Sequence, residues 1–301
     1  MGSSLTMTRN PPRQLGTPIR RALLVGALSL SLLPLMKGGV AIAADDVTRW
    51  DGDARSAARL VAGSQRATDG ALRVGVEIRL TSGWHTYWRY PGDAGVPPQF
   101  DFAGSQNLKR VTVLWPAPQR IEEAGGNTIG YRTGVIFPLR VEPLDAAKPV
   151  LLRLKLDYAI CEKLCVPAEA KAELSVSKGA FKKSTSRDAE LLAAEARVPR
   201  TVKLAEGGPL AIAGVRRESD AARPRVLVDV AASGDVDLFA EGPTAQWALP
   251  LPTRIEGAPA GQQRFAFELD GLPPGASDRG ALLTLTATTP DDAIEVAFRL
   301  D

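Results

Sequence analysis

The stretch PVLLRLKLDY, residues 149–158, alternates apolar and polar side chains, and so does AKAELSV, residues 170–176. Strict alternation is typical of a β-strand that has one buried and one solvated face. Between these stretches lies YAICEKLCVP, residues 158–167, which contains the only two cysteines of the 301-residue chain. The sequence therefore places Cys161 and Cys165 in a connection between two strands, and connections on a rigid sandwich often carry function.

Alternation of the same kind occurs on both sides of this segment. Turn residues separate the alternating stretches, which favours short antiparallel strands packed as a sandwich. We predict one sandwich over residues 45–177 and a second over residues 209–301, and the second contains no chemistry that we can name. The further stretches are residues 71–80, 109–116 and 134–143 before the cysteines, and 225–232, 236–241, 264–271, 282–290 and 294–300 after them.

Residues 178–208 have a different composition. Residues 188–197 are rich in Ala, Glu and Leu and end before Pro199, which predicts a short helix. The flanking residues are polar and basic and include Gly, which suits a linker between domains.

The N-terminus has the features of a secretory signal peptide. Basic residues precede an apolar run of 15 residues, ALLVGALSLSLLPLM, and small residues follow it at an A-x-A site. The run is shorter than the roughly 20 apolar residues that span a bilayer. We therefore predict that residues 1–44 are removed on export and that the mature chain is periplasmic and has no transmembrane segment. A cysteine pair can persist as a disulfide in that compartment.

The net charge changes when this segment is removed. The whole chain carries a formal charge of +3. Residues 1–43 contain five basic groups and no acidic ones, so the mature chain carries about −2. The basicity belongs to the targeting segment, and nucleic acid is not an expected partner.

Two of three possible uses of the cysteines need no exchange chemistry. A purely structural disulfide here would close a loop of about five residues and would stabilise the fold by only about 2 kcal/mol. A disulfide that closes a 100-residue loop contributes roughly 4.7 kcal/mol. The alternative is copper: CEKLCVP resembles the C-x-x-x-C-P loop of Sco-type copper chaperones, and thiolates favour Cu(I). His85, the only histidine, would be the third ligand, although a lone histidine beside a tryptophan is more often a packing residue.

The third use is thiol–disulfide exchange. One thiol of a neighbouring pair can attack a partner and the other can resolve the mixed disulfide. Lys163 between the cysteines favours a thiolate and Glu162 opposes it. Four aromatic residues precede the cysteines: Trp84, Tyr87, Trp88 and Tyr90. They either pack in the core of the sandwich or form a surface beside the thiols where partner proteins dock.

Three blocks of sequence point to a known family. They are GWHTYWRYPGDAGVPP (83–98), WPAPQRIEEAGGNTIGYRTGVIFPLRV (115–141) and LKLDYAICEKLCVPAEAKAEL (154–174). In order and spacing they resemble the N-terminal periplasmic domain of DsbD-type protein-disulfide reductases, especially the ScsB branch, over residues 47–177. The resemblance implies an immunoglobulin-like fold for this region. Together with the alternation after residue 209, we expect an all-β chain of two immunoglobulin-like β-sandwich domains joined by a short helical linker.

The resemblance also implies roles for individual residues. Cys161 and Cys165 would be the catalytic pair, with Cys165 attacking partners and Cys161 resolving the mixed disulfide. A cap loop over residues 121–131 would shield them, and the glycine-rich stretch GGNTIGYRTG, residues 125–134, is interpreted as mobile. The modulating residues would be Glu122, Glu123, Tyr131 and Tyr158, with no metal ligand and no cofactor.

The chain departs from the family in three respects. Only three residues separate its cysteines, whereas the better-known members have five. Ala124 stands where the family has the aromatic residue that caps the sulfurs. The membrane electron-conducting segment and the thioredoxin-like domain are absent from the sequence. We therefore expect a thiol–disulfide oxidoreductase that depends on a separate membrane electron conductor and serves exported thioredoxin-like or disulfide isomerase-like proteins.

Overall fold

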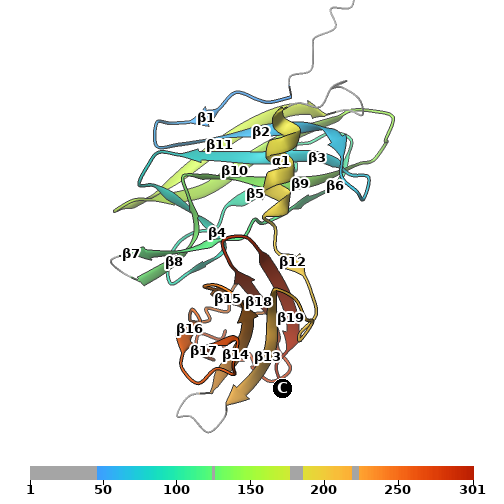
Figure 1. Ribbon diagram of the computed structural model, residues 1–301. Helices are drawn as coiled ribbons and strands as arrows, with labels where there is room; N and C mark the ends of the chain where they lie inside the picture. The colour runs from blue at the N-terminus through green and yellow to red at the C-terminus, as the bar shows by residue number, and fades with distance from the viewer. Residues whose placement is uncertain (1–45, 124–125, 177–185, 219–223) are drawn as a thin grey trace, which may run out of the picture. The chain divides into compact units, whose positions relative to one another are not determined.

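The computed structural model describes residues 46–123, 126–176, 186–218 and 224–301. In this part of the chain, strands form two β-rich bodies, with one short helix between them in the sequence (Figure 1). Both bodies belong to one unit, Ala43–Asp301. The predicted signal peptide and Ala124 lie outside the described residues. The domain boundaries proposed from the sequence stay predictions.

The first body consists of two sheets. One has the order β1-β2-β3-β9-β6, with bounds β1 Asp51–Gly52, β2 Ser56–Arg66, β3 Leu72–Leu80, β9 Gly134–Pro143 and β6 Leu108–Val113. The other has the order β11-β10-β4-β8-β7, with bounds β11 Cys165–Val176, β10 Val150–Cys161, β4 His85–Gly92, β8 Gly126–Arg132 and β7 Gln119–Glu123; β5, Gln99–Asp101, pairs with β10. Alternate residues of the two sheets meet in one hydrophobic core that includes Leu60, Val76, Trp88, Phe137 and Leu156.

The second body is also a pair of sheets. The first has the order β12-β19-β18-β15, with bounds β12 Arg200–Thr201, β19 Ala293–Arg299, β18 Leu282–Thr288 and β15 Asp237–Glu241. The second has the order β13-β14-β17-β16, with bounds β13 Leu210–Glu218, β14 Arg225–Ala232, β17 Gln262–Glu268 and β16 Thr253–Ile255. Trp247, Phe265 and Leu285 are among the buried side chains of its core.

The sequence prediction of an all-β chain is confirmed, and two of the strands that it missed share a cause. No alternating stretch was found for β2 or β4. Both strands begin with consecutive buried residues, because each is covered on both faces. A strand of this kind loses the polar alternation by which a half-buried strand is recognised.

The described part of the predicted cap is regular β-structure. The described part of residues 121–131 belongs to the antiparallel strands β7 and β8, and β8 also pairs with β4. Gly130 is needed for this pairing, because a Cβ there would lie 2.0 Å from the carbonyl oxygen of Thr86. The glycine-rich composition therefore reflects a close approach of two backbones as well as turns.

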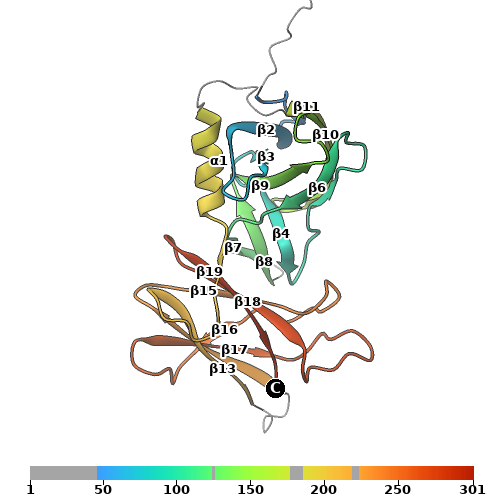
Figure 2. The same ribbon diagram turned by 90° about the vertical axis from the view of Figure 1, so that its right-hand side faces the viewer.

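The predicted helix exists as α1, Ser186–Ala196, but it is not a free connector. It packs against β2, β3 and β9 of the first body (Figure 2). Leu191 is fully buried there, and a Cβ at Gly75 would lie 2.7 Å from its Cδ2. Since Val74 and Val76 face the core, Gly75 faces the other side, so α1 covers the outer face of this sheet.

Polar contacts hold both ends of α1 to the sheet. Near its start, the Asp188 carboxylate accepts hydrogen bonds from the backbone N–H and the hydroxyl of Ser64, at 2.8 and 2.5 Å. A carboxylate in the first turn also interacts favourably with the helix dipole. In the last turn, the Glu195 carboxylate accepts hydrogen bonds from Arg73 at 2.6 and 3.1 Å and from Arg140 at 2.7 Å. These contacts attach the helix to the first body.

Strand β4 also contacts residues of the second body. The Trp88 ring lies 5.9 Å from the Phe239 ring, centroid to centroid. The Arg89 guanidinium donates to the Glu241 carboxylate at 2.7 Å and also pairs with Glu295. The Tyr90 hydroxyl donates to the carbonyl oxygen of Leu249. Residues of the second body thus help to fix β4.

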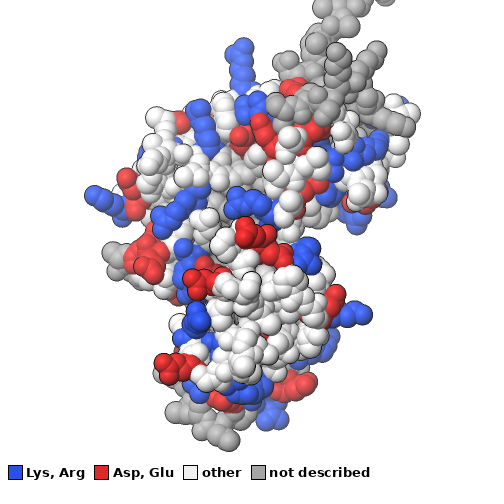
Figure 3. All heavy atoms as spheres, viewed as in Figure 1, with Lys and Arg blue, Asp and Glu red and all other residues white. Residues whose placement is uncertain are grey.

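Charged side chains of both signs are intermixed on the face shown in Figure 3. Many charged side chains of the described residues form ion pairs, and Arg153–Glu173 at 2.5 Å and Arg225–Glu218 at 2.7 Å are two examples. Exposed pairs of this kind contribute about 0–1 kcal/mol each. The two hydrophobic cores therefore provide most of the stability. Among the described residues, no helix has the length and apolar character that crossing a bilayer requires.

We expect Leu191→Ala to lower the free energy of unfolding by about 2–5 kcal/mol, because it leaves a cavity between α1 and the sheet. Leu192→Ala is the matched control: Leu192 is 45% exposed, and its loss should change stability by less than about 0.5 kcal/mol. Urea unfolding followed by circular dichroism measures both. Equal effects of the two substitutions would show that α1 does not stabilise the first body.

Candidate functional site

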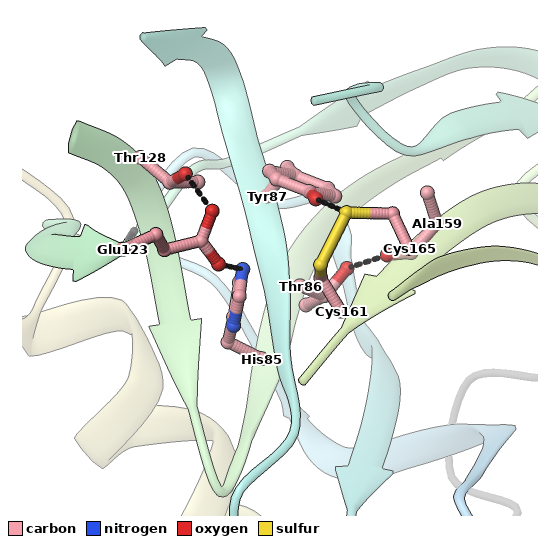
Figure 4. Close-up of a disulfide and its surroundings, with 8 residues drawn as sticks. All are labelled: His85, Thr86, Tyr87, Glu123, Thr128, Ala159, Cys161 and Cys165. Carbon is pink, nitrogen blue, oxygen red and sulfur yellow. Dashed lines mark hydrogen bonds and ion pairs between the residues drawn. A yellow bond between two sulfur atoms is a disulfide. The ribbon is translucent and has the colours of Figure 1, made fainter. Parts of the chain in front are cut away.

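The two cysteines form a disulfide at the turn end of a long hairpin. Strands β10 and β11 pair from Val150 with Val176 to Cys161 with Cys165, so the cysteines are direct cross-strand partners. Their Cα atoms are 4.1 Å apart and their Sγ atoms are bonded (Figure 4). Opposed residues of an antiparallel pair approach to roughly 4.5 Å, which brings the sulfurs within bonding reach. The predicted connection is therefore only three residues long, Glu162 to Leu164.

The two sulfurs lie in different surroundings. Cys161 is 4% exposed and packs against Tyr87 and Ala159. Cys165 is exposed, and its neighbour Leu164 is 74% exposed at the tip of the hairpin. An incoming protein can reach Cys165, whereas Cys161 lies behind it against the sheet.

Strand β4 supplies the side chains beside the disulfide. His85 is the register partner of Cys161, and Thr86 is the partner of Ile160. Because side chains alternate between the faces of a strand, His85 and Tyr87 lie on the cysteine side, while Trp88 lies in the core. The Tyr87 hydroxyl is 3.1 Å from Cys165 Sγ, in hydrogen-bonding geometry (Figure 4).

Tyr87 is held in a dry position. It is 1% exposed, and a Cβ at Gly95 would lie 2.3 Å from its ring, so the loop after β4 passes directly over it. Burial raises the pKa of Tyr87, and the nearby Glu123 carboxylate raises it further. The hydroxyl therefore keeps its proton at neutral pH and can donate a hydrogen bond to sulfur.

A second polar group faces the disulfide from the β7–β8 hairpin. The Glu123 Oε1 atom lies 3.0 Å from His85 Nε2, and its Oε2 accepts a hydrogen bond from Thr128 Oγ1 at 2.9 Å (Figure 4). His85 Nε2 is fully buried and makes no hydrogen bond to any described residue. His85, Glu123 and Cys161 offer metal-ligand atoms that all lie within 4.8 Å of one another.

Burial lowers the pKa of His85, and the charge of Arg132 lowers it further, while Glu123 opposes both. Burial is the largest of these influences. We therefore take the ring to be neutral at pH 7, so its proximity to Glu123 is not a full ion pair.

A cavity of about 440 Å³ opens beside the disulfide. Both cysteines, His85, Glu123 and the hairpin residues Glu162 and Lys163 are among the residues that line it. Its walls combine the disulfide with acidic and basic side chains.

The predicted modulating residues divide into two groups. Glu123 is at the site, and Glu122 lines the rim of the cavity but is exposed. By strand alternation, Glu122 points to the face opposite Glu123. Tyr131 and Tyr158 lie in the sandwich core, where their hydroxyls contact the carbonyl oxygen of Pro116 at 2.8 Å and Ser56 Oγ at 2.9 Å. The structure thus does not bring these two tyrosines to the sulfurs.

Sequence reasoning underrated His85 and did not single out Thr128 or Arg132. A lone histidine beside a tryptophan is more often a surface or packing residue, so the sequence makes His85 a ligand only in the copper alternative. The spacing of His85 and Tyr87 is the signal that was present, because residues two apart on a strand share one face. The aromatic cluster is divided by the same rule: Tyr87 belongs to the site and Trp88 to the core.

Residues 57–177 match the family described as thiol:disulfide interchange protein DsbD, N-terminal. These residues form a DsbD N-terminal domain. The matched segment contains β2 to β11, and with them the whole of the disulfide site. The resemblance inferred from the three sequence blocks is therefore confirmed.

The fold is also similar to a solved structure, the N-terminal periplasmic domain of ScsB from Proteus mirabilis. The TM-score is 0.65 at 19% sequence identity, and the match covers 85% of this chain and 98% of that one. The likeness therefore extends beyond the DsbD N-terminal domain into the second β-rich body. No match was found among curated protein sequences.

We expect the oxidised protein to lose stability as the pH falls below 6.5, the ordinary pKa of histidine. The unfolded chain protonates His85 more readily than the folded one does, so acid favours unfolding, by at most about 1.4 kcal/mol per pH unit. His85→Gln should abolish this dependence between pH 6.5 and the lowered pKa. Urea unfolding in metal-free buffer measures it. Because His85 is the only histidine, an unchanged slope in His85→Gln would contradict the assignment.

Proposed function

We propose that this protein is an exported thiol–disulfide oxidoreductase of the protein-disulfide reductase type. Its Cys161/Cys165 pair would pass electrons from a separate membrane conductor to exported disulfide proteins. The observation that carries the proposal is a disulfide with one exposed and one buried cysteine, set in a DsbD N-terminal domain.

The proposed reaction begins with the reduced pair. The Cys165 thiolate attacks a partner's disulfide, forms a mixed disulfide and releases one partner thiolate. The Cys161 thiolate then attacks Cys165 Sγ, which restores the Cys161–Cys165 disulfide and releases the second partner thiolate. Two electrons pass to the partner, and its two thiolates take up two protons. The membrane conductor would return two electrons by the reverse exchange.

The site supports this assignment of the two sulfurs. A partner must approach the attacking sulfur from solvent, and Cys165 is the exposed cysteine. The resolving sulfur needs only to reach its neighbour across the strand pair. The Tyr87 hydroxyl can stabilise negative charge on Cys165 by donating a hydrogen bond.

The hairpin tip supports a protein as the substrate. Leu164 directly precedes Cys165 and is 74% exposed, so it offers an apolar contact beside the attacking sulfur. Thioredoxin-like or disulfide isomerase-like proteins of the same compartment are the proposed partners, because their disulfides are built for exchange. The proposed compartment is the periplasm, which is where the similar ScsB domain is described.

We expect Cys161→Ala to accumulate a mixed disulfide through Cys165, because the sulfur that would resolve it is absent. Cys165→Ala should accumulate little, because Cys161 is 4% exposed. Non-reducing electrophoresis and mass spectrometry of periplasmic extracts measure both, and circular dichroism checks that the variants fold. Equal trapping, or trapping through Cys161 alone, would contradict the assignment. A disulfide that resists reduction in the parent protein would favour a structural bridge.

Tyr87→Phe should slow the reaction of the reduced protein with a small disulfide by about tenfold or more. A hydrogen bond to a charged group is worth about 1.5–3 kcal/mol, and this one would be lost from the attacking sulfur. Tyr158→Phe is the matched control, because its hydroxyl contacts Ser56 in the core. Stopped-flow kinetics at constant pH compares the two. Equal rates for both variants would remove Tyr87 from the reaction.

A further inference from the structure

We propose that the reduced protein binds one Zn²⁺ ion through His85, Glu123 and Cys161, at a site that the disulfide form lacks. The inference rests on the proposed function in one respect, because it needs a disulfide that can be opened. It goes beyond that function by giving the reduced state a metal-bound form.

The geometry of the three residues carries the proposal. Their ligand atoms lie within 4.8 Å of one another, and a tetrahedral Zn²⁺ ion with these donors separates its ligands by roughly 3.3–3.6 Å. Each residue comes from a different strand of one sheet, with His85 on β4, Glu123 on β7 and Cys161 on β10. A rotation of side chains on these paired strands can close the remaining distance.

His85 supplies an independent observation. It is 2% exposed, and its buried Nε2 atom has no hydrogen-bond partner although it lies 3.0 Å from Glu123 Oε1. A buried polar atom without a partner costs about 1–3 kcal/mol. The histidine nitrogen and the carboxylate oxygen lie close together without a hydrogen bond between them. Two ligands of one cation have this arrangement.

Thr128 holds the carboxylate in the orientation that a metal would need. Its hydroxyl donates to Glu123 Oε2 at 2.9 Å, which leaves Oε1 facing His85 (Figure 4). Hydrogen bonds of this kind orient metal-binding carboxylates in proteins. The arrangement therefore includes one contact that supports a ligand without touching the metal.

The donor set favours Zn²⁺ over other common ions. A thiolate, an imidazole and a carboxylate are all accepted by Zn²⁺. Cu(I) favours soft sulfur ligands and gains little from the carboxylate, while Ca²⁺ and Mg²⁺ prefer oxygen ligands alone. A copper site would therefore depend on the cysteines and not on Glu123.

The oxidation state decides whether the site exists. In the disulfide, Cys161 Sγ is bonded to Cys165 Sγ and is not a thiolate. Reduction adds two electrons and two protons and gives two thiols. Zn²⁺ then displaces the Cys161 proton, and Cys165 or a water molecule takes the fourth position. A bound ion would hold the resolving sulfur and favour the reduced form by mass action.

The test is a Zn²⁺ titration of the full exported chain in competition with a chromogenic chelator. The protein is reduced with a phosphine and desalted without oxygen, and its free thiols are counted first. We expect one Zn²⁺ per reduced chain and none per oxidised chain. His85→Ala and Glu123→Gln should each weaken binding by about tenfold or more. Glu122→Gln is the matched control, because Glu122 is exposed and is not one of the three clustered ligands, and it should bind as the parent does.

Cobalt provides a second readout that does not depend on exchange activity. Co²⁺ added to the reduced parent protein should give a thiolate-to-metal absorption band that is lost in Cys161→Ser. The zinc proposal is overturned if oxidised and reduced protein bind alike, if Glu122→Gln and Glu123→Gln bind alike, or if only Cu(I) binds, regardless of Glu123. Two free thiols with exchange activity but without Zn²⁺ binding would overturn this proposal and leave the exchange function standing. A disulfide that cannot be reduced would overturn both.

Discussion

The position of β4 between β10 and β8 is the constraint on which the site depends. A central strand with both neighbours paired is fixed in register, and its side chains must alternate between two faces. One face of β4 places Trp88 in the sandwich core. The other face places His85 and Tyr87 against the cysteines. The packing that stabilises the fold therefore also positions the groups around the disulfide.

The β10–β11 ladder sets the relation between the two sulfurs. Because Cys161 and Cys165 are opposed residues, both side chains point to the same face of the sheet. A slip of one residue would turn one cysteine to the other face and separate the pair. The ladder also makes the sulfurs unequal, since Cys161 ends a central strand and Cys165 begins an edge strand. Unequal access is what an exchange site needs, because one sulfur must attack and the other must resolve.

Elements without any proposed chemical role support this arrangement from outside. Helix α1 covers the outer face of the opposite sheet through Leu191 and through polar contacts at both of its ends. The second body contacts β4 next to the site through Arg89 and Tyr90. These contacts give the residues after 177 a physical reason to accompany the DsbD N-terminal domain.

The sequence by itself determined the β-rich architecture, the helix and the family of the cysteine-bearing domain. Half-buried strands alternate visibly, and the hairpin residues Cys161 and Cys165 are close in the chain, so local information was sufficient for them. Only the tertiary structure decided which distant residues meet the sulfurs. His85, Glu123 and Tyr87 reach the site through pairing between strands far apart in the sequence, and β4 hides its alternation because both of its faces are buried. Glu122 and Glu123 are neighbours in the chain but face opposite sides of one strand, and only the register of β7 with β8 shows which carboxylate faces the histidine.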